Sequence, residues 1–143
     1  MFKFGLSFIP LFVVLLLGCG SSHTKNSIPE AYSNQVELKP AADLENTVES
    51  TVYIDSVQVY ESDDRLSLLV LGAFPDGCTS IGEADFQTRA DTISLSLSTW
   101  RNPDQACTQA LIAFSFIYRK IPEPVLREAR VVNINGTDYS LTQ

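Results

Sequence analysis

The stretch that decides the fold reads Thr92-Ile93-Ser94-Leu95-Ser96-Leu97-Ser98-Thr99. Apolar and polar residues alternate strictly along it, and successive side chains of a β-strand point to opposite faces of a sheet. The stretch therefore predicts a strand with an inward face of isoleucine and leucine and an outward face of serine.

Other β-patterned segments lie on both sides of this strand. Residues 65–74 form a nearly continuous apolar run, which predicts a central strand covered on both faces. Residues 51–60 are β-branched and aromatic, but their apolar positions change phase after Asp55-Ser56, which predicts a bulge. Further strands are predicted over residues 110–118, 127–133 and 139–141.

Turn signals separate the segments at regular intervals: Asp-Asp at residues 63–64, Pro-Asp-Gly at 75–77 and Asn-Gly at 135–136. Two prolines predict a stiff loop over residues 121–124. We therefore expect an all-β fold over residues 47–143, in the form of a small antiparallel β-sandwich that is immunoglobulin-like and has six or seven strands.

The N-terminus has the pattern of a secretory signal peptide over residues 1–18. Lys3 precedes an apolar run of roughly 13 residues, which is shorter than the roughly 20 residues that a membrane-spanning helix needs. Residues 19–46, which begin with Cys19, are mostly polar and have no sustained apolar period. They are expected to form a flexible tether ahead of the folded domain.

The end of the apolar run, Leu16-Leu17-Gly18-Cys19, resembles the lipobox of bacterial lipoproteins. The resemblance implies cleavage before Cys19, diacylglycerol on its sulfur, and an acyl chain such as palmitate on the new amino group. Two or more acyl chains anchor a protein stably to a membrane. Gly20 is compatible with the outer membrane if the source is Gram-negative. We therefore expect a lipid-anchored protein of the cell envelope.

The other two cysteines, Cys78 and Cys107, are expected to form a disulfide, because an oxidising compartment lets such a pair persist. The lipobox resemblance assigns the third cysteine of the chain to lipid. A metal site or a redox-active pair is the alternative. Neither is favoured, since there is no Cys-x-x-Cys and the one histidine, His23, lies in the predicted tether. No metal ligand set and no cofactor is indicated.

The charge and the catalytic side chains limit the function classes. The formal net charge of −7 argues against a nucleic-acid partner, because such binding needs basic patches that neutralise phosphates. Nucleophilic catalysis needs a base beside the nucleophile, and the one histidine, His23, lies in the predicted tether. The remaining possibility for an enzyme is a pair of catalytic carboxylates. The acidic residues available for such a pair lie in predicted turns or solvated strands: Asp63, Asp64, Glu83, Asp85 and Asp104. Glu61, Asp63 and Asp64 could supply oxygen ligands for Ca²⁺ but lack the spacing of a calcium loop, which favours a solvated hairpin tip.

The candidate binding surface combines four basic residues and a tryptophan. Arg119, Lys120, Arg127 and Arg130 flank the proline loop. Such charges are more typical of a solvated sheet edge that discourages strand addition. The functional alternative is a locally positive end of the sandwich that meets an acidic partner or polymer. Trp100 follows the alternating strand, either as an exposed binding side chain or as part of the core.

A second resemblance covers the domain itself. Phe-Pro-Asp-Gly-Cys at residues 74–78, Cys107 ahead of residues 110–116, and Val-Asn-Ile-Asn-Gly at 132–136 resemble a pattern in uncharacterised immunoglobulin-like domains of bacterial envelope proteins. This implies a fold and no activity. Three hypotheses remain. We favour a non-enzymatic module that contacts an envelope protein or surface polymer; the others are a small-ligand-binding or inhibitor-type domain, and an enzyme with a carboxylate pair.

Overall fold

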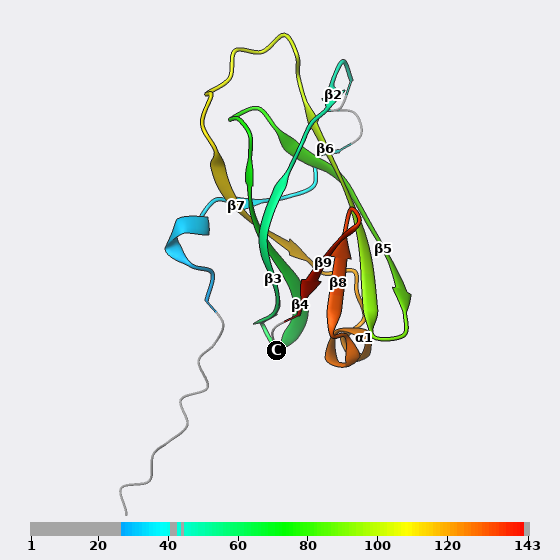
Figure 1. Ribbon diagram of the computed structural model, residues 1–143. Helices are drawn as coiled ribbons and strands as arrows, with labels where there is room; N and C mark the ends of the chain where they lie inside the picture. Colours follow the sequence, from blue (N-terminus) through cyan, green and yellow to red (C-terminus); the bar gives the residue numbers. More distant parts are fainter. Residues whose placement is uncertain (1–26, 41–42, 44, 142–143) are drawn as a thin grey trace, which may run out of the picture.

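The computed structural model describes residues 27–40, 43 and 45–141 (Figure 1). Within them, nine strands form two sheets that pack around one core, so the predicted β-sandwich is confirmed. In chain order the elements are η1 (Glu30–Tyr32), β1 (Gln35–Val36), β2 (Val48–Glu49), β3 (Tyr53–Ser62), β4 (Arg65–Phe74), β5 (Ser80–Arg89), β6 (Thr92–Arg101), β7 (Ile112–Tyr118), α1 (Glu123–Glu128), β8 (Val131–Ile134) and β9 (Thr137–Ser140). The predicted signal peptide, lipobox and Cys19 lie outside the described residues.

The strand order departs from the predicted arrangement. One sheet has the order β1-β7-β4-β3. In the other, β5 pairs along β6, while β8 and β2 pair with the beginning and the end of β6, and β9 pairs with β8. The pairings β1 with β7 and β6 with β8 are parallel, so the prediction of an antiparallel sandwich with six or seven strands is wrong in these details. The second parallel pair arises because the chain leaves β6, runs back through the other sheet as β7, and returns beside β6 as β8 (Figure 1).

The core lies between the two sheets. Ile93, Leu95 and Leu97 of β6 are buried there, while Ser94 and Ser96 are exposed, as the alternating stretch predicts. Consecutive residues of β4 are buried, so this strand is covered on both faces, as its apolar run predicts. Burial of each large aliphatic side chain contributes about 1.5–3 kcal/mol, which fixes the register of the strands that carry them.

The predicted local irregularities occur where the sequence places them. The register of β3 against β4 shifts between Ile54 and Ser56, which is the predicted bulge. Asn135 and Gly136 join β8 to β9 with φ angles of 49° and 90°. Glycine adopts this left-handed region without a steric penalty and asparagine tolerates it, so Asn-Gly closes the hairpin with little strain.

Part of the predicted tether is folded onto the sandwich. We call residues 30–39 the strap. Its strand β1 pairs with β7, the Lys39 N–H donates to the Ile81 carbonyl of β5 at 2.9 Å, and Val36 and Leu38 pack against the core. The prediction of a flexible tether is therefore wrong for this segment. Two apolar side chains in a polar stretch give no periodic signal in the sequence. In the structure they pack against the core beside β7, the strand that β1 pairs with.

The chain after β7 also differs from the prediction. The sequence predicts a loop over residues 121–124 and a strand over 127–133, whereas α1 occupies residues 123–128 and the strand, β8, begins only at Val131. Pro122 precedes the helix and Pro124 lies in its first turn, where the missing N–H of proline removes no helical hydrogen bond. Leu126 is fully buried in the core and holds the helix against the sandwich.

Candidate functional site

The predicted disulfide is confirmed: Cys78 and Cys107 are bridged, with their Cα atoms 5.5 Å apart. The bridge joins the loop after β4 to the long loop between β6 and β7 (Figure 1, green and yellow). We call this end of the sandwich the disulfide end and the opposite end, where α1 lies, the helix end. Both loops are held in place because each carries one of the two cysteines.

Asp76 is a buried acidic residue at the disulfide end, with 5% of its surface exposed. Its carboxylate accepts hydrogen bonds from the N–H groups of Cys78 and Thr79, both at 2.9 Å, and from the Thr79 hydroxyl at 3.0 Å. Arg101 approaches the other carboxylate oxygen at 3.5 Å. Burial alone would raise the pKa of Asp76, but the hydrogen bonds and the arginine charge outweigh it and lower this pKa below its usual value.

Trp100 also lies at the disulfide end. It sits in β6 between Glu49 of β2 and Ser80 of β5, and its side chain is partly buried. In the part of the chain that the structure describes, its enclosed indole N–H has no hydrogen-bond partner. Trp100 is thus packed between neighbouring strands rather than displayed on a loop.

The basic candidate residues lie at the opposite end. Arg119, Lys120, Arg127 and Arg130 are exposed near α1, at the helix end. Strand β6 begins at the helix end and reaches Trp100 eight residues later, which corresponds to about 26 Å of strand. The residues predicted as one binding surface therefore occupy two separate places.

Arg119 and Lys120 border a groove of about 310 Å³ beside β7, which we call the β7 groove. It opens where the strap leaves β7 for β5. Tyr118 closes the gap behind it, since its hydroxyl donates to the Ala84 carbonyl of β5 at 3.1 Å, and burial raises the pKa of Tyr118. The groove is lined by Gln35, Val36, Glu37, Leu38, Phe116, Ile117, Tyr118, Arg119 and Lys120.

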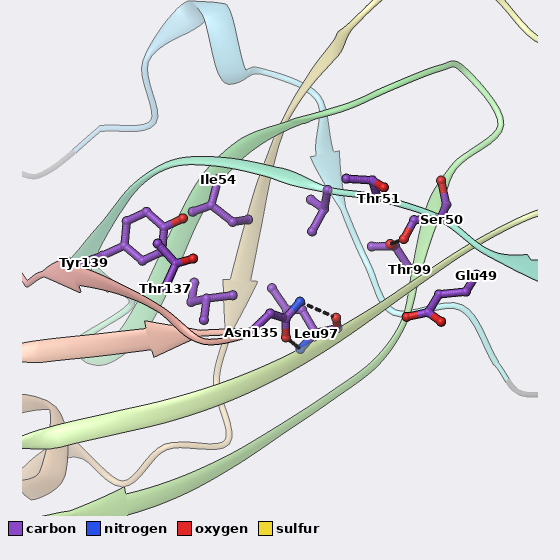
Figure 2. Close-up of a pocket in the computed structure, with 11 residues that line it drawn as sticks. Glu49, Ser50, Thr51, Ile54, Leu97, Thr99, Asn135, Thr137 and Tyr139 are labelled. Carbon is purple, nitrogen blue, oxygen red and sulfur yellow. Dashed lines mark hydrogen bonds between the residues drawn. The ribbon is translucent and has the colours of Figure 1, made fainter.

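A second groove, of about 320 Å³, lies between the start of β3 and the β8–β9 hairpin (Figure 2). We call it the Tyr139 groove. Tyr139 lies at one end of it and Glu49 at the other, with hydroxyl-bearing and apolar side chains between them (Figure 2). Its lining is Glu49, Ser50, Thr51, Val52, Ile54, Leu97, Thr99, Ile134, Asn135, Thr137 and Tyr139.

Both walls of the Tyr139 groove are hydrogen-bonded to β6. On one side the Asn135 amide accepts from the Leu97 N–H at 2.9 Å and donates to the Leu97 carbonyl at 2.8 Å, as a neighbouring strand would. On the other side the Ser50 N–H donates to the Thr99 carbonyl at 2.8 Å, and the Thr99 hydroxyl donates to the Ser50 carbonyl at 2.6 Å. The groove is therefore preformed, as ligand sites usually are.

The second wall is also connected to the disulfide end. The Ser50 and Thr79 hydroxyls lie 3.0 Å apart, and the Thr79 hydroxyl donates to Asp76. A chain of hydrogen bonds thus runs from the carboxylate of Asp76 through Thr79 and Ser50 to Thr99. Such polar networks hold their members in one arrangement when each group is satisfied.

Removing the Asn135 amide should release the first wall. We expect Asn135→Gly to lower the free energy of unfolding by about 1–2 kcal/mol, because Leu97 loses two hydrogen bonds while glycine keeps the positive φ. Asn135→Asp should also lower the stability, because it keeps the acceptor but places a carboxylate oxygen against the Leu97 carbonyl oxygen. Urea unfolding measures both variants, and equal stability of Asn135→Gly and the parent would contradict the role of the amide.

Comparison with known proteins identifies one family for this chain. A family model of the ORF11 β-sandwich domain matches residues 68–142, which are 75 of the 143 residues. The chain belongs to this family. The matched part of the ORF11 β-sandwich domain runs from within β4 past β9 and includes the disulfide, Asp76 and Asn135. No curated protein and no solved structure matches the chain.

None of the residues that line the Tyr139 groove of this ORF11 β-sandwich domain is predicted as a site residue. The lining comes from separate segments of the chain and forms no short sequence motif. One local signal exists, since an asparagine in a turn readily bonds backbone groups with its side chain. Within the described ranges, no three His, Cys, Asp or Glu side chains gather as metal ligands. No helix of those ranges has the length and apolar character needed to cross a membrane.

Proposed function

We propose that this ORF11 β-sandwich domain is the folded part of a bacterial envelope lipoprotein, anchored through Cys19. It acts as a non-enzymatic module that binds an acidic partner protein or surface polymer. The lipobox resemblance supports the anchor. The Cys78–Cys107 disulfide supports the compartment, because such bonds persist in oxidising surroundings. If the source is Gram-negative, Gly20 favours the outer membrane.

The observation that carries the binding role is the pair Arg119 and Lys120, exposed at the β7 groove of a chain with net charge −7. An acidic partner is attracted to this place and repelled by most of the remaining surface, which favours one docking orientation. Arg130 adds charge at the same end. Arg127 contributes less positive charge to this end, because Glu123 forms an ion pair with it at 3.6 Å.

Reversing the charge of Arg119 and Lys120 tests the binding role. The full chain, immobilised on beads, is offered detergent-solubilised envelope, and the retained protein or polymer is quantified. We expect Arg119→Glu with Lys120→Glu to reduce retention at least about tenfold, since both attractive contacts become repulsive. The matched control reverses two other exposed arginines, Arg65 and Arg89, and should retain the partner. Arg65 and Arg89 also lie at the helix end but outside the β7 groove, so equal loss in both double variants would contradict a site at Arg119 and Lys120.

The anchor is tested separately. Cys19→Ser removes the sulfur that the lipobox resemblance assigns to lipid, so the protein is expected to leave the membrane fraction, because a domain without acyl chains has little membrane affinity. Fractionation followed by an alkaline carbonate wash measures this, with the parent chain as the control. Retention of Cys19→Ser in the washed membrane pellet would refute the lipid anchor.

A second candidate function, small-ligand binding, is favoured by a different observation. The Tyr139 groove is preformed and lies apart from Arg119 and Lys120, between β3 and the β8–β9 hairpin. Its lining combines hydroxyl groups, a carboxylate and apolar side chains, which together define a class of ligand.

A further inference from the structure

We infer that the Tyr139 groove binds a neutral saccharide. The groove offers hydroxyl groups from Thr51, Thr137 and Tyr139 and a carboxylate from Glu49. Hydroxyl groups both donate and accept hydrogen bonds, whereas a carboxylate only accepts them. Sugar hydroxyls have the matching capacity, because each can donate to the carboxylate and exchange bonds with the protein hydroxyls.

The apolar part of the groove fits the other side of a sugar ring. Val52 and Ile54 contribute partly exposed aliphatic surface between the polar groups. Leu97 and Ile134 are buried at the base of the groove, and the ring of Tyr139 lies close to Ile54 (Figure 2). A pyranose has a polar edge of hydroxyls and a face of C–H groups. Burying that face against aliphatic and aromatic carbon contributes about 25 cal/mol per Å² removed from water. The volume of about 320 Å³ is at the lower end of small-molecule sites and suits one or two sugar units.

Two other ligand classes fit less well. An extended peptide binds a sheet edge through its main chain, but at this point of β6 the Leu97 N–H and carbonyl are bonded to Asn135, and the Thr99 carbonyl is bonded to Ser50. An anionic ligand would meet Glu49 and a chain of net charge −7. The saccharide is therefore expected to carry no carboxylate, sulfate or phosphate.

The groove is built to keep its shape without a ligand. Its walls are clamped to β6 by Asn135 on one side and by Ser50 on the other, and Ser50 is held in turn by Thr79 and Asp76. A preformed site loses less conformational entropy on binding than a mobile one. The inference depends on neither the lipid anchor nor the β7 groove.

The experiment is an oligosaccharide array probed with the full chain carrying Cys19→Ser, followed by NMR titration with the best binder. The array holds neutral oligosaccharides, among them chitotetraose and maltotetraose, next to sulfated and uronic-acid oligosaccharides. We expect neutral oligosaccharides to be retained and the titration to shift the amide signals of Thr51, Thr137 and Tyr139. Glu49→Gln should weaken the binding about tenfold, because the charge of the acceptor is lost and one of its two oxygens becomes a donor.

The control variant is Ser96→Ala, which removes an exposed hydroxyl from the outer face of β6 and should bind like the parent. Because Glu49 is exposed, its substitution leaves the core intact, so lost binding reports on the groove. The inference is overturned if no neutral oligosaccharide is retained, if the acidic ones are preferred, or if Glu49→Gln and Ser96→Ala behave alike. The charge reversal at Arg119 and Lys120 should leave saccharide binding unchanged, which separates this result from the partner test.

Discussion

Replacing Cys78 and Cys107 together by serine is expected to lower the free energy of unfolding by about 3–4 kcal/mol. The bridge closes a loop between cysteines 29 positions apart, and removing it returns the entropy of that loop to the unfolded chain. For a domain of this size, the loss corresponds to a fall in Tm on the order of 20 °C. Calorimetry of the full chain in the Cys19→Ser background measures it.

A chemical control accompanies this prediction. A reductant added to the parent chain should bring its Tm down to that of the double variant, while the double variant should not respond to the reductant. A stabilising disulfide would be contradicted if the double variant had the same Tm as the parent, or if the reductant did not lower the Tm of the parent.

The second large effect is expected at Asp76. Asp76→Ala should lower the free energy of unfolding by about 3 kcal/mol, because the N–H groups of Cys78 and Thr79, the Thr79 hydroxyl and Arg101 lose a charged acceptor in a buried place. Arg101 is partly exposed, which keeps the loss below that of a fully buried ion pair. Urea unfolding measures the effect, and Asp104→Asn, at an exposed aspartate of the neighbouring loop, serves as the control.

The same carboxylate gives the stability a defined pH dependence. The pKa of Asp76 is lowered in the folded protein, so the folded state holds the charged form more tightly than the unfolded chain does. Its contribution is fully present above the unfolded pKa of about 3.9 and is lost as the pH falls through the folded value. The difference in unfolding free energy between the parent and Asp76→Asn should therefore shrink below about pH 4. A difference that stays constant into strong acid would rule out this linkage.

The sequence predicts the elements whose signal is local. The alternation in β6, the apolar run of β4 and the Asn-Gly hairpin each depend on adjacent residues, and all three are found. Strand β5 is not predicted because its register shifts between Ile81 and Glu83. Its other buried positions are Gly82 and Ala84, with Phe86 partly buried. Strands are predicted from the alternation of apolar and polar residues, and a bulge together with small inward residues removes this alternation.

Non-local features could not be predicted in the same way. The parallel pairing of β6 with β8 follows from the path of the chain between the sheets, which no single segment encodes. The separation of Trp100 from Arg119 and Lys120 has the same origin, since it depends on the direction in which β6 and β7 run. The Tyr139 groove combines Glu49, Asn135 and other residues far apart in the sequence. In contrast, the disulfide is predicted from the number of cysteines together with the expected export of the chain.

The strap changes how far the domain can travel from its anchor. Had folding begun at residue 47, up to about 98 Å of extended chain would separate Cys19 from the first folded residue. The strap already contacts the sandwich at Tyr32, whose hydroxyl donates to the Asp55 carboxylate at 2.9 Å, and the thirteen peptide steps from Cys19 to Tyr32 span at most about 46 Å. Under the proposed anchor at Cys19, this shorter reach would keep the domain close to the membrane, where its partners would be molecules in or on that surface and not in a distant layer.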